Sequence, residues 1–382
     1  MGGAPSFDVA IAGGGIAGAS LAVMLGRAGL SVALYEQRAF PSEKPCGEGL
    51  MPAGVGVLER LGLSDPIGGF PFVGIRYRAG DVLVEGRFPR TIGVPPCGLG
   101  QRRLRLDHAL FQAAVSTPGV RATQGVRVEG PLVEAGRVVG LRAGGSDVRA
   151  RLVVAADGPL SPLRRALGLD GVRARRQRMG VRAHFRLAPG QVAPDHVEIF
   201  LGAGHELYVT PLPDGEVLIA GLADSAAVLG QARTAYARWI DAQPILRARL
   251  EGAAALTDVE GRAPLASRAR AGFVPGAVLL GDAAGFIDPV TGGGMAQALL
   301  AAELLAAHAP HMLAPGPSGD AWLRRFDARR NALLRSYRAL THVVLWLAGS
   351  PRRARFALRT LRATPWLFRH LIGVAGGTRR LV

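Results

Sequence analysis

The chain has 382 residues, 49% of them hydrophobic, and can therefore bury a large core in one big domain or two medium ones. Its two cysteines, Cys46 and Cys97, do not make a disulfide framework, and no apolar stretch is long enough to span a bilayer. The formal net charge is +17, but Lys44 is the only lysine among the 46 basic residues, a bias that indicates a G+C-rich coding sequence as much as a basic surface. No nucleic-acid-binding module is recognisable, so we expect no nucleic-acid partner.

The first elements of the chain predict a dinucleotide-binding unit. Residues 9–12 form an apolar run typical of a buried strand, residues 19–27 predict a helix, and residues 31–35 predict a second strand that ends on Glu36. The turn before the helix reads Gly13-Gly14-Gly15-Ile16-Ala17-Gly18. Its first glycine permits a tight bend, its second lets a pyrophosphate approach the backbone, and its third lets helix and strand pack closely. Glu36, at the end of the second strand, can accept hydrogen bonds from ribose hydroxyls, but the dinucleotide-binding unit alone does not distinguish FAD from NAD.

Two later motifs bear on the choice between FAD and NAD. Residues 153–164 predict a strand, an Asp157-Gly158 turn and a short helix. Residues 279–289 predict a strand, a Gly281-Asp282 turn and a loop, which leads into Gly292-Gly293-Gly294 and a helix from Met295. With the glycine turn, these motifs resemble, in order and spacing, the three signatures of the FAD-dependent aromatic-hydroxylase superfamily (group A flavoprotein monooxygenases). That superfamily also contains flavin halogenases and geranylgeranyl reductases.

The resemblance implies an α/β fold with a Rossmann-like FAD-binding domain, an antiparallel β-sheet substrate domain and a C-terminal helical segment. The implied FAD-binding domain is discontinuous and covers residues 1–70, 98–170 and 266–330. The substrate domain covers residues 71–97 and 171–265, and the helical region covers residues 331–382. Within the substrate domain, residues 196–201, 206–210 and 216–220 alternate apolar and polar side chains between glycine-rich turns, which predicts antiparallel strands.

The resemblance also implies site residues. Gly13, Gly15, Gly18 and Glu36 match the adenosine and pyrophosphate contacts, and Arg103, with Arg102 as a substitute, matches an arginine that reaches FAD from the start of a helix. Asp157 and Gly158 match a motif credited with FAD and NADPH contacts, and Asp282 matches the acid that binds the ribityl chain; the alternative is that both acids merely form turns. Gly292, Gly293 and Gly294 match a helix start beside the flavin ring, where a helix N-terminus stabilises the anionic reduced flavin. The remaining implied cofactor positions are Ile16, Ala17, Gln37, Val126, Gly281, Pro289 and Met295.

The segment Lys44-Pro45-Cys46-Gly47-Glu48-Gly49-Leu50 bears on the branch of the superfamily. This segment and residues 288–294 are similar to the geranylgeranyl-reductase branch, which usually has Glu where Gly293 stands. The halogenase signature Trp-x-Trp-x-Ile-Pro is absent. The corresponding loop in the superfamily passes the flavin ring, so Cys46 and Glu48 are candidate catalytic residues, with Cys46 alternatively a small buried apolar residue. On the predicted sheet, the candidates that face the flavin are His184, His205, Tyr208 and Thr210.

Near the C-terminus, Arg352, Arg355, Arg359 and Arg362 recur at helical spacing, and Trp366 follows. The commoner arrangement is a terminal helix docked on the body with a solvated basic face. The alternative is peripheral contact with the inner face of an anionic membrane. Because no basic segment followed by an apolar stretch opens the chain, we expect no secretory signal and a cytoplasmic protein.

Three functions remain open. The first is an FAD-dependent monooxygenase that uses NAD(P)H and O2 to hydroxylate or epoxidise a lipophilic aromatic, quinone or polyketide- or terpenoid-like secondary metabolite, with the flavin supplying the chemistry and the protein a dry cavity. The second is a geranylgeranyl-reductase-type flavoprotein that saturates isoprenoid C=C bonds. The third is a non-catalytic flavin-binding protein. We expect the first, and no metal site, since no metal-ligand cluster is visible; the sequence leaves the oligomeric state open.

Overall fold

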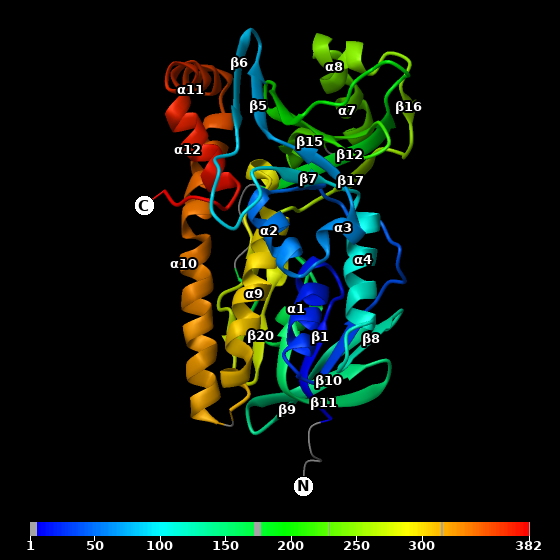
Figure 1. The fold of residues 1–382 in the computed structure, drawn as a ribbon, viewed down its shortest axis with the longest axis vertical. Helices are drawn as coiled ribbons and strands as arrows, with labels where there is room; N and C mark the ends of the chain where they lie inside the picture. Colours follow the sequence, from blue (N-terminus) through cyan, green and yellow to red (C-terminus); the bar gives the residue numbers. More distant parts are fainter. Residues whose placement is uncertain (1–5, 172–176, 229, 315, 382) are drawn as a thin grey trace.

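The computed structural model describes residues 6–171, 177–228, 230–314 and 316–381 (Figure 1). The expected domain ranges also include residues 1–5, 172–176, 229, 315 and 382, which lie outside the described part of the chain. The molecule is elongated, with one large sheet in each half and a long helix running along its side (Figure 1). This arrangement confirms the expected α/β fold with a Rossmann-like half, a sheet that is mostly antiparallel, and C-terminal helices.

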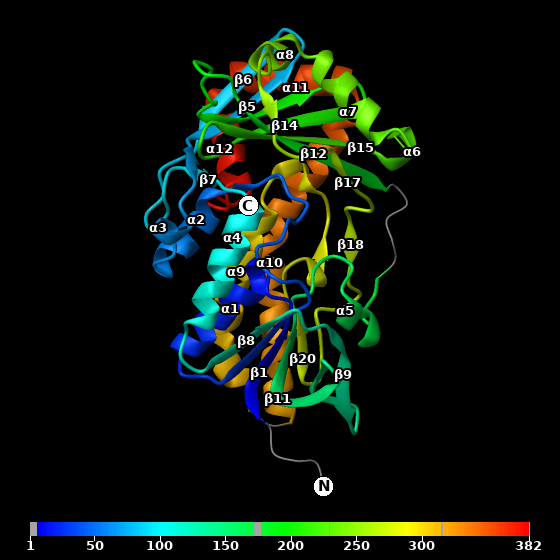
Figure 2. The ribbon, with the colours of Figure 1, turned by 90° about the vertical axis from the view of Figure 1, so that its right-hand side faces the viewer.

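The sheet nearer the N-terminus has a parallel core. Its strands, in spatial order, are β20 (Ala277–Leu279), β11 (Ser146–Ala155), β1 (Phe7–Ala12), β2 (Val32–Glu36) and β8 (Val120–Gln124). The antiparallel strand β19 (Phe273–Val274) closes one edge, while β9 (Val128–Glu134) and β10 (Arg137–Ala143) extend from β11. Residues 9–12 are an unbroken apolar run because the sheet is buried on both faces, with helices on one and the β9–β10 ribbon on the other (Figure 2).

Three helices cover the first of these faces: α1 (Ile16–Arg27), α4 (Arg103–Val115) and α9 (Gly294–Met312). Because α1 and α9 both begin at glycine-rich turns at the carboxyl end of the first sheet, their N-termini lie at the same edge of that sheet. That edge faces the second sheet (Figure 2).

The second sheet is antiparallel except for one pair. Its order is β16 (Ala254–Ala255), β12 (Arg178–Arg186), β15 (Glu216–Asp224), β14 (His205–Pro211), β13 (His196–Leu201), β5 (Gly74–Ala79) and β6 (Val82–Arg87), and β17 (Glu260–Arg262) also pairs with β12. The exception is β5, which runs parallel to β13. Helices α7 (Ala232–Asp241) and α8 (Pro244–Arg249) cover its outer face, where Leu207 and Val209 pack with Tyr236.

The C-terminal helices are α10 (Pro317–Ala348), α11 (Pro351–Ala363) and α12 (Pro365–Ala375). The expected boundary between residues 330 and 331 falls inside α10, because no proline interrupts the helix after its first position. Among the described residues, no helix combines the length and the apolarity needed to cross a membrane.

Shorter elements connect these parts. They are β3 (Gly49–Leu50), β4 (Phe70–Phe72), β7 (Gly98–Gly100), β18 (Ser267–Arg268), β21 (Gly285–Phe286), α2 (Pro52–Arg60), α3 (Ser64–Ile67), α5 (Pro162–Ala166), α6 (Ser225–Val228) and the 3₁₀ helices Gly281–Ala284 and Pro289–Thr291.

Candidate functional site

The glycine turn between β1 and α1 is required by close packing at two of its three positions. Gly13 has φ +102°, and a Cβ atom there would lie 2.3 Å from the carbonyl oxygen of Ala156. A Cβ atom at Gly18 would lie 1.9 Å from the carbonyl oxygen of Gly13. At Gly15 the nearest atom to such a Cβ is the flexible Nζ of Lys44 at 3.3 Å. The fold therefore demands Gly13 and Gly18, whereas Gly15 keeps open space above the backbone.

Glu36, at the end of β2, is buried and holds the turn. Its Oε2 accepts a hydrogen bond from the Gly14 N–H at 3.0 Å, and its Oε1 accepts one from the Arg38 N–H at 3.1 Å. Lys44 Nζ lies 3.4 Å from the same Oε2 and 3.2 Å from Oδ2 of Asp107, a buried residue of α4. The only lysine of the chain thus lies beside the open backbone at Gly15.

Arg103, at the start of α4, is the fourth member of a charged row that also contains Glu36, Lys44 and Asp107. Its guanidinium donates to both carboxylate oxygens of Asp107, at 2.7 and 2.8 Å. Although burial opposes it, pairing with Arg103 and Lys44 holds the pKa of Asp107 below its ordinary value. Arg102 instead pairs with Glu43 and contacts Glu216, so Arg103 is the arginine that belongs to this row. Sequence reasoning missed Asp107, although its spacing of four residues from Arg103 on a predicted helix was a usable signal.

Asp282, in the 3₁₀ helix after β20, has a different environment. Among the described residues, no group donates a hydrogen bond to its carboxylate, and its backbone carbonyl accepts one from Ser267. Desolvation raises the pKa of Asp282, and the charges of Arg103 and Arg262 oppose this only in part. A desolvated acid without donors is typical of a binding position whose partner is a ligand.

The start of α9 follows a tight turn in which Gly292 is left-handed, with φ +68°. Gly293 lies against Tyr337 of α10: a Cβ atom there would be 2.3 Å from the ring, and its N–H donates to the tyrosine hydroxyl at 3.1 Å. Tyr337 therefore gives a physical reason for glycine at the position where the geranylgeranyl-reductase branch usually has Glu.

The remaining implied cofactor positions lie along the same edge. Ile16 and Ala17 form the first turn of α1, Gln37 follows β2, and the Val126 N–H donates to the carbonyl oxygen of Glu36 at 3.0 Å. Gly281 opens the 3₁₀ helix of Asp282, Pro289 opens the next one, and Met295 is buried in the first turn of α9.

Asp157 is engaged within its own turn. Its Oδ2 accepts from the Leu163 N–H at 3.0 Å and its Oδ1 accepts from the Ser161 hydroxyl, so both oxygens organise the start of α5; Gly158, with φ +85°, makes the turn possible. Arg164 of α5 donates to the carbonyl oxygen of Ala283 at 3.0 Å. These contacts fit the alternative that Asp157 is a turn acid, and Arg164 connects its motif to that of Asp282.

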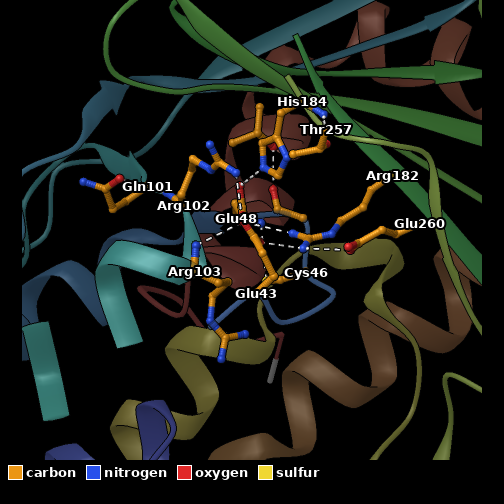
Figure 3. A network of polar contacts seen from close by, with 12 residues as sticks. Glu43, Cys46, Glu48, Gln101, Arg102, Arg103, Arg182, His184, Thr257 and Glu260 are labelled. Atoms are coloured by element: carbon orange, nitrogen blue, oxygen red, sulfur yellow. Dashed lines mark hydrogen bonds and ion pairs between the residues drawn. The ribbon is translucent and has the colours of Figure 1, made fainter. Parts of the chain in front are cut away.

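Glu48 lies at the centre of a buried polar network between the two halves (Figure 3). It has a left-handed φ of +57°, a conformation rare for a side-chain-bearing residue. Its Oε1 accepts from the Arg103 N–H and from Arg182 Nη1, both at 3.0 Å, and its Oε2 lies 2.7 Å from Nε2 of His184. Strained backbone held by several buried contacts is common at functional sites.

Two further links extend this network. Nδ1 of His184 lies 3.2 Å from the hydroxyl of Thr257, and Arg182 also pairs with Glu43 at 2.8 Å and with Glu260 at 3.2 Å. Figure 3 shows these side chains converging from β12, from the start of α4 and from the loop that carries Glu48. On the loop, the Cys46 sulfur accepts the Glu48 N–H at 3.3 Å. Contact with Arg103 brings Cys46 to the charged row as well.

The three candidate residues on β14 lie on two different faces of the strand, because side chains alternate along it. Tyr208 and Thr210 face the other half of the molecule: the Tyr208 hydroxyl donates to the carbonyl oxygen of Val290 at 3.2 Å, and the Thr210 hydroxyl to that of Gly47 at 2.7 Å. His205 differs from the expectation, because it lies three residues before Tyr208 and therefore on the opposite face of β14. There it stacks on Trp239 of α7 with ring centroids 4.8 Å apart.

Comparison with known proteins decides the family. A family model described as FAD binding domain matches residues 6–336 of the chain. The protein belongs to this family of FAD-binding proteins. It is 32% identical over 354 residues to menaquinone reductase of Mycobacterium tuberculosis, a match that covers 87% of this chain and 85% of that protein. The protein is thus an FAD-dependent oxidoreductase.

Other relatives differ in reaction. Digeranylgeranylglycerophospholipid reductase 2 of Methanopyrus kandleri is 26% identical over 333 residues, covering 85% of this chain and 82% of that protein. 6-Methylpretetramide 4-monooxygenase of Streptomyces rimosus is 32% identical over 170 residues, covering 42% and 41%. The structure of a myxobacterial chondrochloren halogenase shares the fold, with a TM-score of 0.79 at 24% identity over 98% of this chain and 99% of that one.

The residues present fit FAD on two structural grounds. The backbone at Gly15 is open beside Lys44, which suits a pyrophosphate, and the Asp282 carboxylate has no donor of its own among the described residues, which suits a polyhydroxylated ribityl chain.

We expect Asp282→Asn to stabilise the FAD-free protein by about 1 kcal/mol at neutral pH while lowering FAD affinity about tenfold. Because burial raises the pKa of Asp282, the folded state binds more protons than the unfolded state between the two pKa values. Stability of the FAD-free protein therefore falls as pH rises from about 4, and neutral asparagine removes this loss. Denaturant unfolding of the stripped protein and titration with FAD measure both effects; tighter FAD binding by the variant would contradict the assignment.

Proposed function

We propose that this protein is a reductase that saturates a C=C bond in the isoprenoid chain of a quinone-type lipid. The observation that carries the proposal is the extent of its similarity to menaquinone reductase, which includes both halves of the molecule. The substrates named for this relative and for digeranylgeranylglycerophospholipid reductase differ in their head groups and share isoprenoid chains. That common chemistry favours reduction of the chain over reaction at a head group.

The site supplies what such a reduction needs from the protein. Bound FAD would supply hydride, with NAD(P)H as the expected source of electrons. Saturation also requires a proton on the neighbouring carbon. Glu48, His184 and Thr257 form a hydrogen-bonded line that leads from buried Glu48, on the loop of Cys46, to the partly exposed Thr257. This line can hold a proton close to the loop.

Monooxygenation is the second candidate, and the partial similarity to 6-methylpretetramide 4-monooxygenase favours it. The two functions differ in the fate of oxygen. A reductase adds two hydrogens to its substrate without O2, whereas a monooxygenase transfers one oxygen atom from O2.

The test uses the purified yellow protein, an electron donor and a menaquinone with a fully unsaturated chain, in a glove box and in air with labelled O2. We expect a product heavier by two hydrogens under both conditions. A product formed only in air and carrying labelled oxygen would overturn the proposal in favour of monooxygenation. Failure to convert this quinone, other prenyl lipids or aromatic substrates would favour the non-catalytic alternative. FAD-depleted protein is the control.

A further inference from the structure

The last part of the chain is strongly and uniformly basic. After Asp327, the remaining 55 residues contain 12 arginines and no aspartate or glutamate. Five of these arginines, Arg352, Arg355, Arg359, Arg362 and Arg369, are exposed on α11 and α12. A basic surface without acidic partners within its own segment attracts polyanions.

Large aromatic side chains lie exposed on the three C-terminal helices, α10, α11 and α12. Trp346 near the end of α10 is 60% exposed, Phe356 on α11 is 73% exposed and Trp366 on α12 is 71% exposed. Side chains of this size are normally well buried, and several exposed together mark an interaction surface. The guanidinium of Arg353 lies 4.5 Å from the Trp346 ring centroid, so one arginine already stacks on this aromatic group.

The packing of α11 explains why side chains on this helix remain exposed. The helix contacts the β5–β6 hairpin and buries Ala354 and Leu358, and Arg355 lies against Gly80 at the tip of that hairpin. Phe356 and the arginines at positions 352, 359 and 362 remain exposed. The docked helix expected from the sequence and a basic amphipathic surface are therefore both present, on different sides of one helix. Figure 1 shows α11 and α12 side by side at one end of the molecule, next to the end of α10.

We infer that this C-terminal face (Trp346, Phe356, Trp366 and the exposed arginines of α11 and α12) docks on an anionic phospholipid bilayer. Tryptophan and phenylalanine enter the interfacial region of a bilayer, and arginine pairs with lipid phosphate through parallel hydrogen bonds. Nucleic acid would match the arginines equally well. A lipid surface also accounts for Phe356 and for the neighbouring cleft of about 520 Å³, which lies between α8 and the junction of α10 and α11 and is lined largely by apolar groups, including Phe200, Leu201 and Ile245.

The inference deepens the proposed function, on which its last consequence rests: a quinone-type lipid would be taken from the membrane on which the protein lies. The docking itself requires no turnover. Membrane binding and reductase activity can therefore succeed or fail separately, because binding is measured without substrate and activity can be measured on substrate in detergent.

The experiment is co-sedimentation of the FAD-loaded protein with vesicles of phosphatidylcholine alone or mixed with phosphatidylglycerol. We expect binding to the mixed vesicles, with a blue shift of tryptophan fluorescence, and about tenfold weaker binding for Phe356→Ser/Trp366→Ser. The matched control is Ile92→Ser/Val133→Ser, which removes two exposed apolar side chains elsewhere and should bind as the wild type does. Flavin absorbance and thermal unfolding establish that all variants are folded.

Four results would overturn the inference. The first is equal binding by the Phe356→Ser/Trp366→Ser variant and the wild type. The second is no preference for phosphatidylglycerol. The third is loss of self-association, measured by sedimentation, in place of loss of vesicle binding, which would identify the C-terminal face as an interface between copies of this chain. Tight RNA binding that survives the aromatic substitutions, without vesicle binding, would assign the arginines to nucleic acid.

Discussion

Glu48→Ala is expected to lower the free energy of unfolding by about 3 kcal/mol, because it removes one partner of a buried charged network. Alanine would leave Nε2 of His184, the Arg103 N–H and one side of the Arg182 guanidinium without their acceptor. Arg182 would keep Glu43 and Glu260, which limits the loss. The loop that carries Cys46 would keep only the Glu43–Arg182 pair of these contacts with β12, so we expect altered flavin absorbance. Denaturant unfolding and the flavin spectrum measure the two effects.

Two variants separate the contributions. Glu48→Gln keeps the shape of the side chain and one acceptor, so the expected cost is about 1–2 kcal/mol. Glu85→Ala removes an exposed carboxylate that pairs with Arg76 at 2.7 Å and should cost less than about 1 kcal/mol. If alanine at position 48 were no more harmful than alanine at position 85, the network would not be what holds the loop.

The glycine turn and Glu36 could be predicted from the sequence better than the network around Glu48, because the residues of that network lie far apart along the chain. The glycine turn, its helix and Glu36 lie within 24 residues, so each element could be predicted from its neighbours, and the structure has β1, α1 and β2 where they were expected. His184 lies 136 residues from Glu48 and Arg182 lies 134 residues from it, and only the folded sheet brings them to the loop. No spacing rule relates such positions.

Two expectations differ from the structure for local reasons. Residue type places His205 with Tyr208 and Thr210, although the alternation of a strand separates their faces. The expected boundary at residue 330 falls within α10, which continues through it because its sequence contains no breaker there. The fold class could be predicted because three motifs occur in order. For the C-terminal segment the sequence left a docked helix and a membrane-facing surface open, because the exposure of Trp346, Phe356 and Trp366 depends on how α11 packs.

Gly18→Ala should destabilise the fold, whereas Gly15→Ala should weaken FAD binding, although both change one glycine of one turn to alanine. At Gly18 the new methyl would lie 1.9 Å from a backbone oxygen, so the strand and helix must separate, and we expect a loss of about 3 kcal/mol in the free energy of unfolding with or without FAD. At Gly15, where φ is −75° and the nearest atom is the mobile Lys44 Nζ, alanine fits the FAD-free protein. Its stability should change by less than about 1 kcal/mol.

The cost of Gly15→Ala should appear only when FAD binds, because the methyl group occupies the space through which the pyrophosphate reaches the backbone. We expect FAD affinity to fall about a hundredfold, or about 2.7 kcal/mol, in titrations followed by flavin fluorescence. Lys44 can swing away from the methyl group but the backbone cannot, so a longer side chain at position 15 should weaken binding further without destabilising the FAD-free fold. If Gly15→Ala bound FAD as the wild type does, the pyrophosphate would have to lie away from this turn. The row of Glu36, Lys44, Asp107 and Arg103 would then be structural.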